Sequence, residues 1–247
     1  MRKALVVCRR DVAALAGAPL GWIVAALFLL LAGWFFYSDL VFFVVFGAAN
    51  PSRGLWRFVF LDVRLVVLLL LPLLTMRALA EERRLGTLEL AFSWPVRDGE
   101  LLAGKFLGIL AVYLALLAAS AIGPVVLHAL HSFPLGPVVA GYAGLVLLGV
   151  ACIACGLAAS AMTDNQVVAA MLAYGVLVFS WFVSWNEPAG GETLGPVLLQ
   201  LSLFDHFYGF AEGAIDTRDV AWLLAFGALF LFVAHRALGA RSWRGVA

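Results

Sequence analysis

The chain has 247 residues, of which 64% are hydrophobic and only 13% are charged, and its mean hydropathy is +1.04. Soluble domains carry about 25% charged residues, so the composition excludes an ordinary soluble protein and indicates an all-α integral membrane protein. Because a membrane-spanning helix needs about 20 apolar residues, the length accommodates about six spans with short loops. Residues 1–247 are therefore expected to form a single transmembrane domain.

Residues 1–18 predict a helix that lies in the membrane interface before the first span. One face of this helix is apolar and the opposite face is basic, which is typical of an amphipathic helix at a bilayer surface. The same charges would also fit an ordinary basic flank of the first span. The apolar face carries Leu5, Cys8, Val12 and Leu15, and the basic face carries Arg2, Lys3, Arg9 and Arg10.

Six apolar runs are long enough to cross a membrane, so the sequence predicts six transmembrane helices. A further apolar run at residues 40–49 is too short to cross, and we expect it to extend the first span or to form an interfacial piece on the far side. The six expected spans are residues 20–37, 58–79, 101–127, 137–159, 167–185 and 220–238.

The basic residues divide unequally between the two sides that six spans would create. Twelve of the 16 Lys and Arg residues fall on the side of the two termini, and only four fall on the other side. Because basic residues concentrate in cytoplasmic loops, this distribution predicts that both termini are cytoplasmic. The four exceptions are Arg53, Arg57, Arg64 and Arg218.

The largest loop on the cytoplasmic side, residues 80–100, contains signals for a short helix of its own. Gly86 is a natural C-terminal stop for the second span, and Thr87 is a natural N-cap for the helix that follows. Glu89 falls in the first turn, where the helix dipole favours an acidic residue, and Pro95 follows the end of the helix. We therefore expect a helix at residues 88–93 that two spans hold crosswise beneath the membrane.

This short helix would expose Leu88 and Phe92 among charged residues, which suits a groove on a soluble partner. A solvated loop that faces the lipid headgroups would show the same pattern. Beyond it, we expect Asp98 to cap the third span, and we expect the side chain of Lys105 to snorkel to the membrane surface.

Two stretches resemble a known family. MRALAEERRLGTLELAFSWPVRDGELLAGKFLG, Met76 to Gly108, resembles the signature loop of type-2 ATP-binding-cassette exporter permeases, and the six-span layout is similar along essentially the whole chain. SLFDHFYGFAEGAIDTRDV, Ser202 to Val220, resembles the gliding-motility-type branch of that family, as does RSWRG at residues 241–245. Residues 91–94 depart from the aliphatic and small residues of related loops, so the contact surface here is expected to be customised.

The resemblance implies that the helix beginning at Thr87 is the coupling helix, seated in a groove of a separately encoded cytoplasmic ATPase. It also implies a permease dimer, with itself or with a related permease, in the bacterial inner membrane. ATP and magnesium would bind to the partner ATPase, so this chain is expected to bind no cofactor and to catalyse no reaction. The expected coupling interface is Glu81, Glu82, Arg83, Gly86, Thr87, Leu88, Glu89, Phe92, Pro95 and Lys105.

The segment before the last span, residues 186–219, predicts two short re-entrant helices on the outer side. Residues 193–204 are apolar but only about half a membrane thickness long, and a short aromatic piece follows at residues 205–212. Asp216 can cap the last span, and Asp219 falls in its first turn. The pair suggests an outer gate or a contact for an extracytoplasmic partner, with Phe204, Asp205, His206, Gly209 and Glu212 as candidate residues.

Three other motifs carry weaker signals. Residues 99–106 match most of a phosphate-binding loop, but Phe106 replaces the magnesium-binding Ser or Thr and the segment enters a span. Cys152 and Cys155 lie in the middle of a span among apolar residues, which favours helix packing over redox chemistry. Asp62 and Arg64 are ionisable groups near the outer edge of a span, where pairing inside the protein and simple solvation are both open.

His128 and His131, together with Asp205 and His206, could form a metal or proton site, but no third ligand has a recognisable spacing. We expect no metal site and no nucleic-acid partner. The sequence therefore predicts the permease subunit of an exporter, which couples ATP hydrolysis by a partner subunit to export or to mechanical work. The alternative is a membrane scaffold that recruits a cytoplasmic partner without transport.

Overall fold

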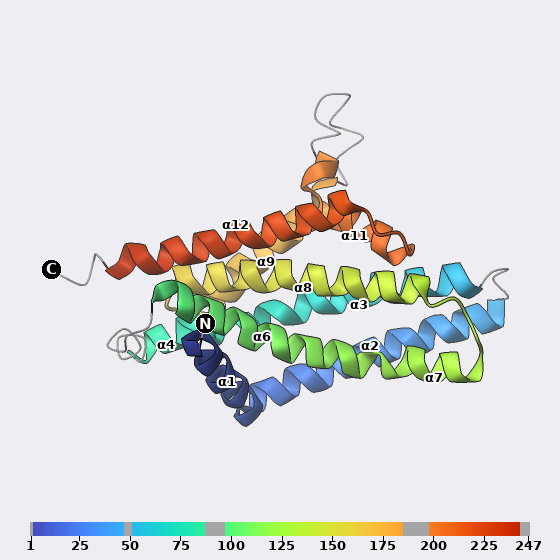
Figure 1. Cartoon of the computed structure of the whole chain (residues 1–247), viewed down its shortest axis with the longest axis horizontal. Helices are drawn as coiled ribbons and strands as arrows, with labels where there is room; N and C mark the ends of the chain where they lie inside the picture. The colour runs from blue at the N-terminus through green and yellow to red at the C-terminus, as the bar shows by residue number, and fades with distance from the viewer. Residues whose placement is uncertain (1, 47–50, 87–96, 185–197, 243–247) are drawn as a thin grey trace.

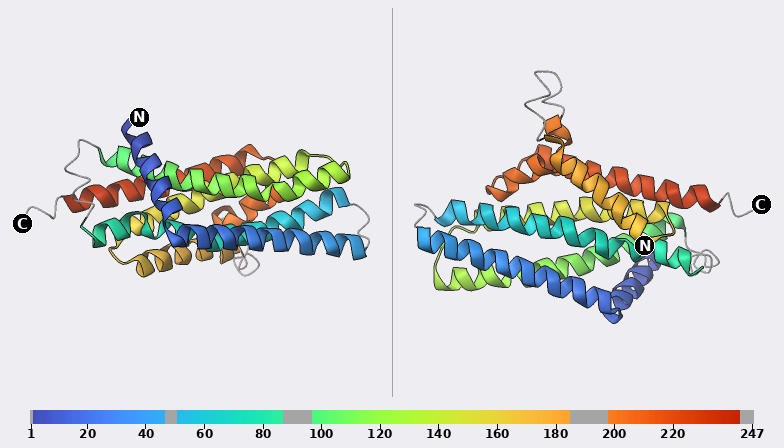
Figure 2. Two further views of the ribbon diagram at one scale, coloured as in Figure 1. Left: turned by 90° about the horizontal axis from the view of Figure 1, so that it is seen from below. Right: turned by 180° about the vertical axis from the view of Figure 1, so that it is seen from behind.

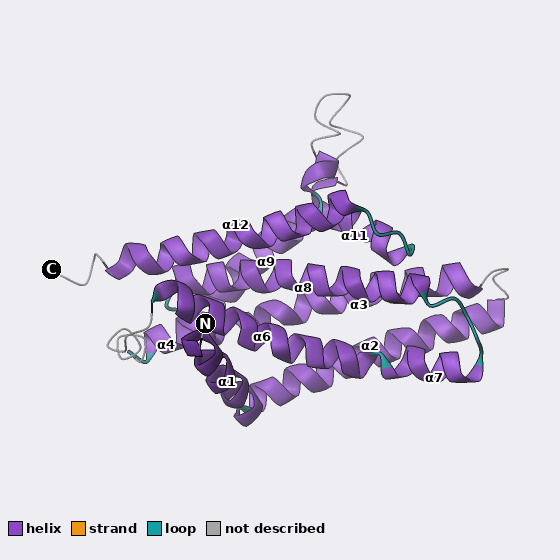
Figure 3. Ribbon diagram, viewed as in Figure 1, coloured by secondary structure: helices purple, strands orange, loops and turns teal. Residues whose placement is uncertain are grey.

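The computed structural model describes residues 2–46, 51–86, 97–184 and 198–242, and all structural statements below refer to these residues. The regular secondary structure in these ranges is helical and contains no strand, as the composition predicts (Figure 3). The main helices are α1 (Arg2–Gly17), α2 (Pro19–Phe46), α3 (Pro51–Thr75), α4 (Arg77–Arg84), α6 (Asp98–Ser120), α7 (Ile122–Leu130), α8 (Gly136–Met162), α9 (Gln166–Phe182), α11 (Leu203–Ala211) and α12 (Thr217–Ser242).

Helix α8 forms the centre of a long bundle. Helices α3, α6, α9, α11 and α12 all pack against α8, while α2 lies along α3 and α1 crosses α6 (Figures 1 and 2). Glycines in α8 permit two of these close approaches, because a Cβ at Gly149 would overlap the ring of Tyr113 and a Cβ at Gly156 would overlap the side chain of Thr75. The small residues of α8 therefore make it the helix on which the others pack.

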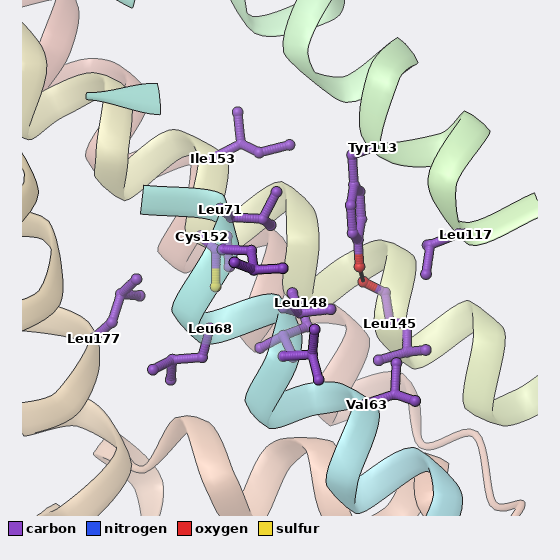
Figure 4. Close-up of a cluster of buried hydrophobic side chains, with 14 of the residues drawn as sticks. Val63, Leu68, Leu71, Tyr113, Leu117, Leu145, Leu148, Cys152, Ile153 and Leu177 are labelled. Carbon is purple, nitrogen blue, oxygen red and sulfur yellow. Dashed lines mark hydrogen bonds between the residues drawn. The ribbon is translucent and has the colours of Figure 1, made fainter. Parts of the chain in front are cut away.

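A single hydrophobic cluster runs through the bundle between α3, α6 and α8. Tyr113 of α6 is fully buried there, and its hydroxyl donates a 2.6 Å hydrogen bond to the carbonyl oxygen of Leu145 on α8 (Figure 4). Cys152 lies in the same cluster and Cys155 is buried one turn further along α8. Both thiols are packing residues in apolar surroundings, as the sequence predicts.

The two ends of the bundle are named here by the elements they contain. The basal end holds α4, the first turn of α6 and the last turns of α12, and the distal end holds the end of α2, the start of α3 and α7 (Figure 1). Helix α11 and the first turns of α12 lie in the distal half of the bundle (Figure 1), and the term distal end also includes them and the residues of α3 that contact α11.

Five helical segments within the described ranges are long and apolar enough to cross a membrane, which makes the chain a multi-pass membrane protein. The fifth expected span, residues 167–185, corresponds to α9, an apolar helix of 17 residues that is shorter than these five. The count of six spans stays a prediction. The five segments are Pro19–Val45, Gly54–Arg84, Asp98–Leu130, Gly136–Met162 and Thr217–Ala240.

The second span is interrupted at Met76, where the sequence predicts a continuous helix. Helix α3 ends at Thr75, whose hydroxyl donates to the carbonyl oxygens of Leu71 and Pro72, at 3.1 and 3.2 Å. A proline inside a helix and a hydroxyl bonded back to the preceding turn both disturb a regular helix. After the turn at Met76 the chain continues as α4, and the two helices belong to one span-length segment, Gly54–Arg84.

Two further boundaries test the expectations. Residues 40–46 continue α2 without a break, so this part of the short apolar run is an extension of the first span. The expectation that Asp98 caps the third span was wrong, because the N-cap is Arg97 and Asp98 is the first helical residue. The carboxylate of Glu100 accepts a 3.2 Å hydrogen bond from the Arg97 N–H and so satisfies a donor at this helix start.

Candidate functional site

The candidate site at the basal end is built on α4. Hydrogen bonds to Ser160 hold the start of this helix against α8. The hydroxyl oxygen of Ser160 accepts hydrogen bonds from the backbone N–H groups of Leu79 and Ala80, at 3.1 and 3.0 Å, and donates one to the carbonyl oxygen of Met76 at 3.0 Å. The first N–H groups of a helix have no partner within the helix. Ser160 supplies these partners, which fixes the start of α4 inside the protein, where Leu79 and Ala80 are fully buried.

Arg83 anchors the other end of α4 to the end of α8. Its guanidinium donates a 2.8 Å hydrogen bond to the carbonyl oxygen of Ala161 and lies 3.3 Å from a carboxylate oxygen of Asp164. Cations near the last carbonyl groups of a helix are stabilised by the helix dipole. The side chain of Arg83 is only 13% exposed, so this expected interface residue holds α4 in place rather than facing outward.

A network of four charged side chains joins α1, α4 and α6. The ammonium nitrogen of Lys105 lies 2.9 Å from a carboxylate oxygen of Glu82 and 3.3 Å from one of Asp11. Arg10 completes the network with contacts of 2.8 Å to Glu82 and 2.9 Å to Asp11. Two cations and two carboxylates from three helices therefore balance one another at one point.

The expectation that Lys105 snorkels to the membrane surface was wrong. Its side chain is 3% exposed, because the carboxylates of Asp11 and Glu82 converge on it from two other helices. A buried ammonium group is tolerated when it is paired and hydrogen-bonded, and both conditions hold here. The one feature of the sequence that could have indicated this pairing is Asp11, the single acidic residue among the first 38 residues.

Helix α1 packs closely on the small residues of α6. A Cβ at Gly104 would lie 2.8 Å from the carbonyl oxygen of Ala4, and a Cβ at Gly108 would lie 3.4 Å from that of Cys8. The Gly104–Gly108 spacing therefore serves close helix packing. Residues 2–17 do form a helix, while its place in the membrane interface stays a prediction.

A partly open cavity of about 300 Å³ lies beside the charged network, between α1, α2, α4 and α6. Its polar wall includes Asp11, Glu82 and Lys105, and its apolar wall includes Leu74 and Ile109. The cavity therefore lies next to the ion pairs that join the three helices, whereas the centre of α8 is closely packed.

Gly86 ends the helical segment that leads into the predicted coupling helix. Its φ of +71° lies in the left-handed region, which glycine adopts without strain. The N–H of Gly86 donates a 3.1 Å hydrogen bond to the carbonyl oxygen of Arg83. Glu81 lies five residues earlier, with a carboxylate oxygen 3.8 Å from Arg77. The remaining expected interface residues, Thr87, Leu88, Glu89, Phe92 and Pro95, lie outside the described residues.

The candidate residues of the predicted outer segment gather on and beside α11. Ser202 caps this helix by accepting a 3.3 Å hydrogen bond from the N–H of Asp205. His206 lies 2.7 Å from a carboxylate oxygen of Asp219 and 3.1 Å from the carbonyl oxygen of Gln200, and its ring stacks on Trp222.

The other candidate residues of this segment lie on the same short helix. A Cβ at Gly209 would lie 3.4 Å from a carboxylate oxygen of Asp219, and Phe204 stacks on Tyr208 one turn away. Glu212, just after the helix, lies 3.5 Å from Arg57 of α3. Asp216 caps α12 as predicted, because its carboxylate accepts a 2.9 Å hydrogen bond from the N–H of Arg218.

Arg64 is a functional candidate that the sequence left open. Its side chain is directed into the protein and is only 5% exposed, so simple solvation of this residue is excluded. Its guanidinium carbon lies 4.2 Å from the ring centres of both Trp181 and Phe204. The signal for this role was an arginine within an apolar span, since such a residue usually faces protein or water.

The phosphate-loop match and the histidine pair have structural explanations in the described part of the chain. Residues 99–106 belong to the helix α6 and do not form a phosphate-binding loop. The ring of His128 lies 4.9 Å from that of Phe133, in an edge-to-face contact. No group of three metal-ligating side chains occurs among the described residues.

The chain also matches a known protein family. A family model described as "ABC-2 family transporter protein" matches residues 5–199. This range extends from α1 through α9 and includes α4 and α6, the helices on either side of residues 87–96. No curated protein matches the chain. The matched range covers well over half of the sequence, and it contains all the expected coupling residues. The chain therefore belongs to the ABC-2 transporter family and is a membrane permease subunit of an ATP-binding-cassette transporter.

Proposed function

We propose that this permease subunit couples ATP hydrolysis by a separate cytoplasmic ATPase to export or mechanical work across the bacterial inner membrane. In this proposal both termini are cytoplasmic, so the basal end of the bundle faces the ATPase. The observation that carries the proposal is the fixed frame around residues 87–96. On one side of these residues α4 is anchored by Ser160 and Arg83, and on the other side α6 is anchored by Lys105.

This frame is suited to transmit a force. The Lys105–Glu82 ion pair joins the helix before residues 87–96 to the helix after them, at 2.9 Å. A partner that moves these residues would therefore displace α4 and α6 together instead of bending one alone. Because α4 continues through the Met76 turn into α3, the displacement would reach a helix that spans the bundle.

Helix α1 belongs to the same frame. Arg10 pairs with Glu82 of α4 and Asp11 pairs with Lys105 of α6, so ion pairs hold α1 to both helices. The Asp11–Lys105 pair is buried, whereas the side chain of Arg10 is 48% exposed. Breaking a buried pair by removing one partner leaves an uncompensated charge and costs about 3–5 kcal/mol. The frame is therefore expected to move as one body when the ATPase partner closes.

The proposal assigns ATP and magnesium to the partner ATPase and requires a second permease protomer, either a copy of this chain or a related permease. It also places the chain in the gliding-motility-type branch, whose resemblance rests on residues 202–220, beyond the matched range. In that branch the output could be mechanical, delivered to an extracytoplasmic partner at residues 186–219. Either output uses the same basal frame.

The test is purification of the tagged protein in mild detergent, followed by mass spectrometry and an ATPase assay of the complex. We expect a stoichiometric nucleotide-binding subunit that is lost from the Glu89→Arg variant. The matched control is Arg218→Glu, which reverses a charge at the distal end and should retain the subunit. Recovery of partners that lack a nucleotide site, without ATPase activity, would instead support the scaffold alternative.

A further inference from the structure

Two arginines of helix α3 contact aromatic residues of α11. Arg57 and Arg64 are seven residues apart, which is about two helical turns, so they lie on the same face of α3. The guanidinium of Arg64 lies 4.2 Å from the ring centre of Phe204 and 5.6 Å from that of Phe207. The guanidinium of Arg57 lies 5.0 Å from the ring centre of Tyr208.

The contacts on α11 form one continuous surface. Phe204 and Tyr208 are four residues apart and stack on each other, and Glu212 follows after four more residues, 3.5 Å from Arg57. Trp181 of α9 closes the other side of Arg64 at 4.2 Å. Arg64 is therefore inserted between two elements, α9 and α11, that are far apart from it in the sequence.

Burying the charge of Arg64 at this position costs free energy. Its side chain is 5% exposed, and within the described ranges neither Nε nor Nη1 has a hydrogen-bond partner. Asp62 and Asp205 interact with its charge, but neither carboxylate forms an ion pair with it within 4 Å. Within the described ranges, the groups that stabilise the buried guanidinium are the rings of Trp181, Phe204 and Phe207. The burial of Arg64 and the position of α11 therefore depend on each other.

We propose that Arg57 and Arg64 form a clamp through which α3 positions α11, so that a displacement of α4 at the basal end is delivered to α11 at the distal end. The inference deepens the proposed function, because it names the residues that carry the motion beyond the frame. Helix α3 is continuous from Arg57 to Thr75, and only the Met76 turn separates it from α4. Cation–π contacts hold a guanidinium over a ring within about 6 Å without fixing one geometry, so the clamp tolerates small shifts without releasing α11.

The clamp is tested with a cysteine that is reactive only when α11 lifts from the bundle. Ala211 of α11 is fully buried, and Ala211→Cys is a small change in volume. The reporter is placed in a Cys8→Ala background, since Cys152 and Cys155 are buried in α8 and Cys8 is the more accessible native thiol. The labelling rate of Cys at position 211 by a maleimide is then measured in nanodiscs, with the chain lacking the reporter as the background.

The first measurement needs no nucleotide and no partner. Because a desolvated cation–π contact contributes on the order of 2 kcal/mol, Arg64→Met should raise the labelling rate by roughly fivefold to thirtyfold. Arg64→Lys retains the charge without the planar face, so its rate should lie between those of Arg64→Met and the parent. Arg218→Met removes an exposed arginine of the same end and should leave the rate unchanged. Equal rates for the parent and both Arg64 variants, each monodisperse in size-exclusion chromatography, would overturn the clamp.

The second measurement uses the complex with its ATPase and a non-hydrolysable ATP analogue. We expect the analogue to change the labelling rate in the parent and to have no effect in Arg64→Met, with partial rescue by Arg64→Lys. A rate that does not respond to the analogue in the parent complex would overturn transmission to α11 while leaving the proposed function intact. Failure to recover any ATPase would refute the proposed function, and the first measurement would still decide whether the clamp exists.

Discussion

The basal and distal ends of the bundle hold their helices by different chemistry. At the basal end, Lys105 is buried between two carboxylates at 2.9 and 3.3 Å, so each charge has a direct partner. At the distal end, Arg64 is buried between aromatic rings and has no ion pair within the described part of the chain. Direct ion pairs in an apolar environment are costly to separate, whereas ring contacts tolerate a range of positions.

This difference matches two mechanical tasks. A part that receives a force must not deform, and the basal network ties α1, α4 and α6 at a single point. A part that delivers a motion to a short helix must keep its hold while the geometry changes, and the rings of Phe204, Phe207 and Tyr208 offer such a surface. The comparison therefore predicts that substitutions at the basal end cost more stability than equivalent substitutions at the distal end.

The largest effect is expected from Lys105→Met. This change leaves Asp11 and Glu82 facing each other with one cation fewer, so we expect the free energy of unfolding to fall by about 3–5 kcal/mol. The measurement is an unfolding titration in mixed detergent micelles, followed by circular dichroism. The control is Arg84→Met, an exposed residue of the neighbouring turn, which should change stability by less than about 0.5 kcal/mol.

A double variant sharpens this prediction. Glu82→Gln removes a negative charge from the same network, so Lys105→Met combined with Glu82→Gln should be less destabilising than the sum of the two single changes. Strict additivity would show that Lys105 and Glu82 are not coupled, and the rigid basal frame would have to be abandoned.

The next largest effect is expected where the last turn of α3 packs against α8. A Cβ at Gly156 would overlap the side chain of Thr75 just before the Met76 turn, so Gly156→Ala should cost about 3 kcal/mol, at the upper end of overpacking effects. The same change at Gly175 of α9, where a Cβ would meet open space, is the matched control. It should be neutral or slightly stabilising, since alanine favours a helix. Equal losses at the two glycines would contradict the close contact between α3 and α8.

Local signals in the sequence predicted much of this structure, whereas contacts between distant residues were not accessible. Gly86 was expected to stop a helix, and its positive φ confirms the local geometry. The surroundings of Lys105 could not be derived in the same way, because its partner Asp11 lies 94 positions away in the sequence. The position of Lys105 at the start of a span predicted that its side chain extends to the membrane surface. Instead, it pairs with the carboxylates of Asp11 and Glu82 inside the protein.

The same distinction applies to Arg64 and Ser160. The rarity of an arginine in an apolar span marked Arg64 for attention, but the rings that enclose it come from α9 and α11. Ser160 carried no signal, because a serine in a helix rich in small residues is ordinary. Its importance follows from the break between α3 and α4 at Met76, because the first N–H groups of α4 bond to its hydroxyl.

A smaller effect is expected when that hydroxyl is removed. Ser160→Ala leaves the N–H groups of Leu79 and Ala80 without their partner, so we expect a loss of about 1–2 kcal/mol in the free energy of unfolding. Hydrogen exchange measured by mass spectrometry should accelerate in α4 more than in α9. Ser180→Ala, at another buried serine, is the control and should leave exchange in α4 unchanged. Unchanged protection of α4 in Ser160→Ala would show that its seat on α8 depends on packing alone.

The smallest effect is expected from Arg57, the exposed member of the clamp. Its side chain is 41% exposed, and that of Glu212, its ion-pair partner, is 47% exposed. Exposed ion pairs contribute about 0–1 kcal/mol, so Arg57→Met should raise the labelling of Ala211→Cys by less than about fivefold, below the effect of Arg64→Met. Raising the salt concentration should reduce the contribution of Arg57, because dissolved ions screen its exposed charge, and should leave that of the buried Arg64 nearly unchanged. An equal salt response of the two variants would mean that both arginines hold α11 by the same exposed electrostatics, and the distal end would then lack the buried anchor that distinguishes it from a surface contact.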